Sequence, residues 1–567
     1  MTKIRGNFMS KIEIKKPKNL GEVLDITGTV LAWAVLIVFF AALPFYFKEG
    51  YSQLASNKYL FFMEASKYTA IVVGVFFLLR LCLWGFTMNE IKAYKKIMWM
   101  DIFVVSFAVI SLISHLLSDF RTNTFDKYYL TEWFYEGSLW GTRGWFMGLM
   151  TFLCFTMLYF FISRALIFKL PVMITAILPM LIICQWGILN RYGIAPIDMN
   201  YDYKDAKAVF LASVGNINWF CGFTSVIVPL IWGLYLGAKK LWYQILLMIA
   251  ATISFTMIIL NSSDSGYVAL AVTVIVMICF AMTDSERTKR CLELLISLFA
   301  VMALVGLIDR IFSGARNRDI GLAEHFIGLP GMILLLFTVI LYVLVTLLKD
   351  RYPAKGMITV RKIFIALVVF VAVMLIVLVV VNTKTNKAVP VIGNIPYFYF
   401  DKKWGGGRRQ TWIMGLETFA HLSFVKKLFG AGPDCFFYQM ISYEDLAAEW
   451  NDYYGSARLT NAHNEILTLL TNIGILGTAA FVGIMVTSVR AAFKAAKERP
   501  EYICFALAVI SYGVNNMFSF QQITNTPFLF LVIGIEAAAL VYDDKAAVRL
   551  TKKEGKHTIQ KGKKSRK

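Results

Sequence analysis

Long apolar runs are the feature that most constrains the fold of this 567-residue chain. Uninterrupted apolar stretches of roughly 18 to 25 residues recur along most of the sequence, and each is long enough to cross a hydrocarbon core of about 30 Å as a helix. The strands of a membrane barrel would be about half as long and would alternate apolar with polar residues. The composition agrees, because 58% of the residues are hydrophobic and only 16% are charged. The sequence therefore predicts an all-α polytopic membrane protein.

The apolar runs and the basic clusters between them predict a topology. We count about fourteen spanning helices by length. Lysine and arginine collect in alternate connections and at both ends, which places those connections and both termini in the cytoplasm. The predicted organisation is a basic cytoplasmic arm (1–25), transmembrane helices 1 to 11 (26–381), a large extracytoplasmic loop with short helices (382–461), transmembrane helices 12 to 14 (462–543) and a basic cytoplasmic tail (544–567).

The formal charge of +21 does not indicate a nucleic-acid partner. The basic residues lie in short clusters between apolar runs and at the chain ends, which fits contact with membrane lipids. The eight cysteines are scattered, with no disulfide framework and no metal-ligand spacing. We therefore predict no metal site and no cofactor.

His463 stands where the large loop turns into a membrane helix, after Asn461, which we predict to cap that helix. The positive end of a helix dipole disfavours a second positive charge, so the imidazole should be neutral and able to accept a proton near pH 7. A histidine at a helix start is also commonly a packing residue. Taken alone, His463 fits that ordinary role better.

Several arginines on the predicted outer side suit phosphate binding. Arg408 and Arg409 follow three glycines, which allow the backbone to approach a ligand closely while guanidinium groups bind phosphate oxygens. Arg143 lies at the outer mouth of the fourth predicted helix, where a membrane anchor is the ordinary alternative. Arg316 and Arg318 form a second cationic patch, although ion pairs with neighbouring carboxylates would serve equally well.

Together these motifs resemble those of the O-antigen ligase and O-antigen polymerase superfamily, which includes bacterial protein O-oligosaccharyltransferases. The segment His463-Asn464-Glu465-Ile466-Leu467 resembles the family's His-Asn box, and Gly474 to Gly477 its Gly-x-x-Gly helix. Residues 407–412, 429–436, 139–144 and 215–218 resemble further family segments. Ser263-Asp264 departs from the pattern, since many members have an arginine after the serine; Arg316 or Arg318 would then supply that contact.

The resemblance implies metal-independent glycosyl transfer in a bacterial cytoplasmic membrane. The donor would be an undecaprenyl-diphosphate-linked oligosaccharide, and the acceptor a hydroxyl of a glycan or another molecule at the outer face. His463 would be the catalytic base. Arg143 with Arg408 or Arg409 would bind the diphosphate, and Asn464 would be a further substrate contact.

Two alternatives to a polysaccharide polymerase stay open at this point. A ligase would use the same donor and the same box but move the glycan to a lipid, wall polymer or protein. A lipid-linked oligosaccharide flippase would be a transporter, for which internal repeats and charges at mid-membrane depth are typical. Arg80 and Glu536 are the main charges inside apolar runs, and no repeat is visible, so an enzyme is favoured over a transporter.

Overall fold

The structure is a computed structural model, and it describes residues 20–83, 96–121, 136–199, 209–348, 354–455 and 460–541. The predicted all-α class is confirmed. Helices account for nearly all of the regular structure, and two residue pairs form a short antiparallel ladder, β1 (Phe210–Leu211) with β2 (Gly215–Asn216). The basic arm and tail predicted at the two ends lie outside the described residues for the most part, although the first helix already begins at Leu20.

Each of the roughly fourteen apolar runs that we predicted to span the membrane contains a helix. Among the described residues, 11 helices are long and apolar enough to cross a membrane. The first spans are α1 (Leu20–Ile37) continued by the π-turn η1 (Val38–Ala42) and α2 (Leu43–Phe45), α3 (Leu54–Cys82), α5 (Trp99–Leu117), η3 (Leu170–Met173) with α7 (Ile174–Arg191), and α9 (Ile217–Gly237). The others are α10 (Leu241–Leu260), α11 (Asp264–Ala281), α12 (Ser285–Ile311), α13 (Leu329–Leu348), α14 (Ala354–Lys384) and α19 (Glu465–Ala495). The three remaining predicted spans are shorter helices, α6 (Leu149–Ala165), α20 (Ile503–Asn516) and Thr526–Val541.

Helix α9 is the centre of the bundle and is almost entirely buried. It packs most extensively on α20, and the turn η6 (Pro500–Tyr502) that precedes α20 also contacts it. Gly233 and Gly237 make this approach possible: a Cβ on Gly233 would lie 2.3 Å from the Cα of Cys504, and one on Gly237 would lie 2.4 Å from the backbone nitrogen of Glu501. Small residues four apart are a common way for two membrane helices to pack closely.

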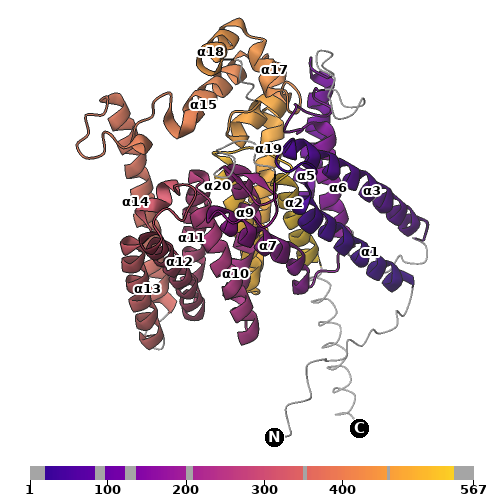
Figure 1. The fold of residues 1–567 in the computed structure, drawn as a ribbon. Helices are drawn as coiled ribbons and strands as arrows, with labels where there is room; N and C mark the ends of the chain where they lie inside the picture. The colour runs from indigo at the N-terminus through magenta and orange to yellow at the C-terminus, as the bar shows by residue number, and fades with distance from the viewer. Residues whose placement is uncertain are drawn as a thin grey trace, which may run out of the picture.

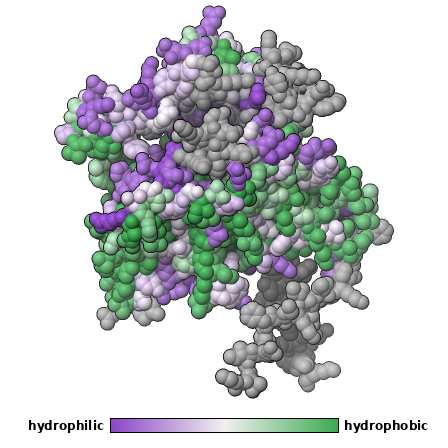
Figure 2. All heavy atoms as spheres, in the orientation of Figure 1, coloured by the Kyte–Doolittle hydropathy of each residue, from purple (hydrophilic) through white to green (hydrophobic). Residues whose placement is uncertain are grey.

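Apolar side chains on the rim of the bundle face outward. Helices α13 and α14 stand at one edge (Figure 1), and long apolar residues such as Leu347 and Phe370 are exposed on them. Figure 2 shows hydrophobic surface across the helices, with hydrophilic residues gathered above it around the large loop. In a membrane this apolar surface contacts lipid.

The charged residues Arg80 and Glu536, which lie inside the apolar runs, each contact a neighbouring helix. Arg80 lies near the end of α3 and forms an ion pair with Asp25 of α1 at 2.7 Å. Glu536, in the buried helix Thr526–Val541, accepts a hydrogen bond from Ser488 of α19. Both residues join neighbouring helices.

The segment between α14 and α19 covers one end of the bundle. It holds η5 (Pro396–Phe398), α15 (Trp404–His421), α16 (Phe424–Phe429), α17 (Phe436–Ile441) and α18 (Glu444–Tyr454). Figure 1 shows α15, α17 and α18 above the ends of α19 and α20. A small core of its own, which includes Met414, Phe436 and Trp450, holds these helices together. We call the described part of this segment, between the end of α14 and the start of α19, the cover. It is joined to the edge of the bundle by the 31-residue helix α14 (Figure 1).

Candidate functional site

The turn that carries His463 is built by two asparagines. Asn464 is the N-cap of α19, and its side-chain oxygen accepts a hydrogen bond from the backbone nitrogen of Leu467 at 3.1 Å. Asn461 lies before this cap, and its side-chain oxygen accepts a hydrogen bond from the backbone nitrogen of His463 at 3.0 Å. The prediction that Asn461 caps the helix was therefore wrong, because the tight turn at His463, with φ of +48°, places Asn461 outside the first helical turn.

His463 lies half-buried among aromatic residues. Its ring packs edge-on against Phe520 at 5.2 Å, and its carbonyl oxygen accepts from the indole nitrogen of Trp412 at 3.4 Å. Nδ1 is buried without a hydrogen-bond partner, while Nε2 makes no hydrogen bond to a described residue and keeps some exposure. Burial, and secondly the nearby positive charge of Arg408, lower the pKa of His463 to about 4. The imidazole is therefore neutral at neutral pH, and a proton can reach it through Nε2.

Arg408 is brought beside His463 by the three glycines that precede it. Gly405, Gly406 and Gly407 have φ angles of 62°, 70° and 91°, a left-handed run that other residues adopt only at a cost. This curl sends the Arg408 side chain under the cover, where Nε donates to the carbonyl of Phe518 at 2.8 Å and Nη1 donates to that of Gly405 at 2.6 Å. Nη2 makes no hydrogen bond to a described residue. Burial lowers the pKa of Arg408, but a guanidinium keeps its charge at neutral pH.

Arg409 is the second arginine of the pair and has a different setting. Its guanidinium lies over the ring of Phe400 at 5.4 Å, and its Nε is buried without a hydrogen-bond partner. Arg409 therefore faces the aromatic residues of the loop, whereas Arg408 faces His463. This difference favours Arg408 as the residue closest to the imidazole and leaves Arg409 as a neighbouring cation.

The turn that bears Arg143 is joined to the site through Asp434. The buried carboxylate of Asp434 accepts from the backbone nitrogens of Thr142 at 2.6 Å and Met147 at 2.9 Å. Trp145 of the same turn packs against Phe520 at 4.6 Å, the ring that also contacts His463. The Arg143 side chain is exposed. The structure thus brings the Arg143 turn to the same end of the bundle as His463, with Phe520 between them.

Gly474 of α19 shapes the helix that begins just after His463. The helix is broken at Gly474, which has φ of +71° and ψ of −175°, so the carbonyls before the break lose their helical partners. The loop after α16 fills that break: the backbone nitrogens of Ala431 and Gly432 donate to the carbonyls of Thr471 and Asn472, both at 2.9 Å. The cover is therefore fastened to the helix that begins just after His463.

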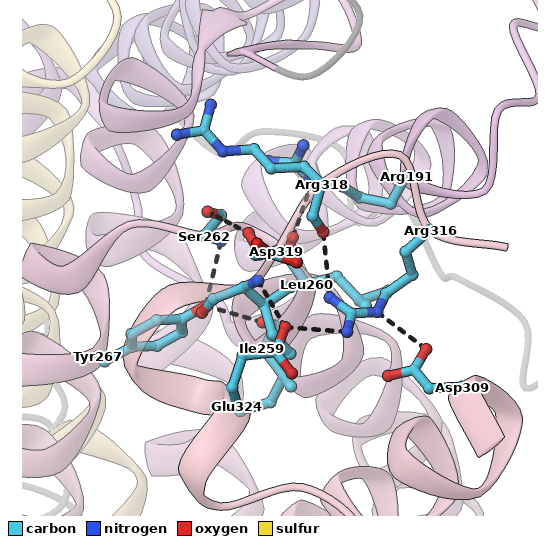
Figure 3. A network of polar contacts seen from close by, with 11 residues as sticks. Arg191, Ile259, Leu260, Ser262, Tyr267, Asp309, Arg316, Arg318, Asp319 and Glu324 are labelled. Carbon is cyan, nitrogen blue, oxygen red and sulfur yellow. Dashed lines mark hydrogen bonds and ion pairs between the residues drawn. The ribbon is translucent and has the colours of Figure 1, made fainter. Parts of the chain in front are cut away.

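Arg316 and Arg318 belong to a separate network, which Figure 3 shows. Arg316 forms ion pairs with Asp309 and Glu324, both at 2.9 Å, and donates to the carbonyl of Arg318 at 3.1 Å. The Arg318 side chain points away from these ion pairs in Figure 3. Two carboxylates thus already balance Arg316, which weakens its predicted role as an auxiliary phosphate contact.

Asp264 lies between this network and the cover. Its carboxylate accepts from the hydroxyl of Tyr397 at 3.3 Å and, more weakly, from the backbone nitrogen of Leu322 at 3.5 Å. Its negative charge also acts on Arg408. The residue at which this chain departs from the family pattern is therefore a counter-charge to Arg408.

A polar stretch that we did not single out from the sequence forms the floor of the site. Residues 515–526 connect α20 to Thr526–Val541, and most of their side chains are polar and buried. This stretch supplies the carbonyl of Phe518 to Arg408 and the ring of Phe520 to His463. Its high polar content between two apolar helices is the signal that could have identified it.

Glu465 joins that floor to the His463 turn. Its carboxylate is buried and accepts from the hydroxyl of Tyr512 at 2.8 Å and from the side-chain amide of Asn516 at 3.0 Å. Glu465 also lines a small pocket together with Asn461, Phe520 and Gln521. The network fixes the start of α19 against α20, so the turn that carries His463 rests on a rigid base.

Comparison with known proteins gives one family match. No curated protein matches the chain. A family model does match: residues 329–482 fit the model described as O-antigen ligase. This range contains α13, α14, the whole cover and the first half of α19, and so includes Arg408, Arg409 and His463. Over this range the chain is therefore similar to the O-antigen ligase family, which supports the predicted resemblance to the O-antigen ligase and O-antigen polymerase superfamily of glycan-transferring membrane enzymes.

Proposed function

We propose that this protein transfers a glycan from undecaprenyl diphosphate to an acceptor hydroxyl at the outer face of the cytoplasmic membrane, as a surface-polysaccharide polymerase. The single observation that carries the proposal is the pairing of a neutral, half-buried His463 with the cation of Arg408 under an extramembrane cover. A base next to a phosphate-binding group is the arrangement that glycosyl transfer from a lipid diphosphate requires. The match to the O-antigen ligase family agrees with it.

The proposed reaction is a displacement at the anomeric carbon. The acceptor hydroxyl donates its proton to Nε2 of His463 while its oxygen bonds to the sugar, and the bond between the sugar and the diphosphate breaks. The leaving undecaprenyl diphosphate gains negative charge, which Arg408 stabilises through Nη2, with Arg409 and Arg143 as further cationic contacts. Asn464 contributes by holding the turn, since its oxygen is engaged in the helix cap.

Donor binding also improves His463 as a base. In the free protein its pKa of about 4 makes the imidazole a weak proton acceptor. A bound diphosphate places negative charge against Arg408 and offsets the cation that lowers this pKa. The pKa of His463 then rises when the donor is in place, although burial still holds it below its ordinary value, so proton acceptance is coupled to donor binding.

A ligase is the alternative reaction, because it needs the same donor and the same base. The transporter alternative is less well supported. Transporters typically use charges and broken helices inside the membrane to bind their substrate. Here Arg80 and Glu536 instead join neighbouring helices, and the backbone of Ala431 and Gly432 fills the break in α19.

The test is glycan analysis of cells that carry wild-type, His463→Ala or His421→Ala protein at equal levels. His421 is a matched control, because it ends α15 on the exposed side of the cover and pairs with Asp445. We expect only His463→Ala to change the glycans. Single repeat units on undecaprenyl diphosphate indicate a polymerase, and full-length lipid-linked chains indicate a ligase. Unchanged pools in His463→Ala would remove the base assignment.

A further inference from the structure

A second candidate binding site lies at the end of the bundle opposite His463. A cavity of about 320 Å³ is bounded by the end of α9, the start of α10 and the segment that leads into η6. Helix α9 starts next to the candidate site, where Trp219 packs against Trp145, and runs 21 residues to Gly237. At 1.5 Å per residue this separates the cavity from the site by roughly 30 Å. Figure 1 shows α10 reaching the bottom of the bundle, with the cover at the top.

The cavity carries an excess of unpaired positive charge. Lys239 and Lys240 line it, are exposed and form no ion pair or hydrogen bond with a described residue. Arg499 also lines it but is partly balanced by Glu501 at 3.7 Å. Glu498 is the remaining carboxylate of the wall. The two positive charges of the lysines exceed the single negative charge of Glu498, the carboxylate that forms no ion pair with a described residue. This excess favours an anionic ligand.

The start of α10 adds to this preference. Lys240 is the N-cap residue, and its side chain makes no capping hydrogen bond, so the first amides of a 20-residue helix lie beside the two lysines. The positive end of a helix and adjacent ammonium groups favour an anionic group such as a phosphate over a neutral ligand. The hydroxyl of Tyr243, which also lines the cavity, is a further donor.

The neighbouring side chains place the cavity at the boundary between lipid and water. Trp242 and Leu241 are 60% and 71% exposed directly after the lysines. Tryptophan next to lysine at the end of a membrane helix is typical of the headgroup layer. Leu170 and Leu234 form an apolar side of the cavity. A ligand that fits has a phosphate for the lysines and an apolar part for the leucines.

We propose that this cavity binds the phosphate of an anionic phospholipid headgroup through Lys239 and Lys240. The shared chemistry is a phosphate group, which a soluble phosphate compound would also offer. The inference does not depend on glycosyl transfer, since no residue of the cavity belongs to the His463 site. A lipid bound here holds α9, α10 and η6 together beneath the site.

The experiment uses the full-length protein, purified in detergent and stripped of lipid. Its melting temperature is measured against increasing dihexanoyl-phosphatidylglycerol, dihexanoyl-phosphatidylcholine or inorganic phosphate. The test variant is Lys239→Gln/Lys240→Gln. The control is Lys494→Gln/Lys497→Gln, which removes the same charge from exposed positions at the same end of the bundle without touching the cavity wall.

We expect phosphatidylglycerol, but not phosphatidylcholine, to stabilise the wild type and the control variant. The test variant should need about 30-fold more phosphatidylglycerol for the same shift. Equal responses of the two double variants, or equal stabilisation by phosphatidylcholine, would overturn the proposal. Inorganic phosphate that stabilises the wild type as well as the lipid does would overturn the lipid assignment in favour of a soluble phosphate ligand. If the double variant has a lower melting temperature than the wild type before lipid is added, the single variant Lys239→Gln takes its place, and the same outcomes decide.

Discussion

Asp434→Ala should release the turn that carries Arg143 from the cover. In the wild type the carboxylate of Asp434 is 4% exposed and accepts from the backbone nitrogens of Thr142 and Met147. Alanine leaves two buried amides without an acceptor, at about 1 to 3 kcal/mol each. It must also adopt the φ of +58° that Asp434 has, at about 1 to 2 kcal/mol. The expected local destabilisation is therefore about 3 to 8 kcal/mol.

Asp434→Asn is the matched variant, because its amide oxygen can accept both hydrogen bonds and asparagine tolerates the left-handed conformation. The assay is hydrogen exchange, followed by mass spectrometry on peptides that contain residues 141–147. In Asp434→Ala the amides of Thr142 and Met147 should exchange at least about 100-fold faster than in the wild type, since 1.4 kcal/mol corresponds to a factor of ten. Asp434→Asn should change by much less. Wild-type exchange rates in Asp434→Ala would refute the view that this carboxylate holds the turn.

Four further predictions concern Arg408 and two glycines. Arg408→Gln should raise the pKa of His463 from about 4, though not to its ordinary 6.5, because burial is the larger cause of the lowered value. In a profile of residual activity against pH, the fall in activity at acidic pH should then occur at a higher pH than in the wild type. An unchanged profile would contradict an effect of Arg408 on His463. In the same variant the folded protein should lose less stability as the pH falls from 6.5 toward 4, because a depressed histidine pKa makes the unfolded state bind the proton first. Gly406→Ala should weaken the apparent donor affinity about 5- to 30-fold. A Cβ at this position would have no atom closer than 3.9 Å, so the cost is only the roughly 1 to 2 kcal/mol of the left-handed backbone conformation. Gly406→Asn should lose less affinity, and equal losses in the two variants would point to another cause. Gly474→Ala should abolish the folded protein in expression trials, because its Cβ would lie 2.4 Å from the backbone of Leu428, whereas Gly513→Ala in α20, with its nearest neighbour at 3.8 Å, should fold normally.

The membrane spans could be predicted because hydrocarbon thickness imposes a length on each apolar run. The short helices of the cover followed from local signals as well. One of the short helices predicted in this loop is α18, Glu444–Tyr454, and it ends at Gly455, which has a positive φ. Apolar residues recur at helical spacing from Arg408 to Lys427, yet the helix is interrupted after His421, where Ser423 caps the separate helix α16. A serine cap inside an apolar pattern is a local signal that helical spacing alone does not resolve.

The contacts within the site could not be predicted, because they join segments that are far apart in the sequence. Arg408 bonds to Phe518, 110 residues later, and Thr142 bonds to Asp434, 292 residues later. The role of Asn461 was mistaken for a similar reason. Whether Asn461 or Asn464 caps α19 depends on the φ of His463, which the surrounding packing sets.

The Gly430 to Asp434 loop links the separate parts of the site and explains why its pattern needs small residues. At one end, Ala431 and Gly432 fill the break in α19. At the other, Asp434 holds the Arg143 turn. Gly430 allows the loop to lie on the backbone of Asn472, where an added Cβ would come within 2.2 Å of the carbonyl oxygen. Helix α17 adds a second connection, because Tyr438 donates to the carboxylate of Glu136, which also accepts from the backbone nitrogen of Arg143 at 3.1 Å. The Arg143 turn is therefore held to the cover both by Asp434 and through Glu136.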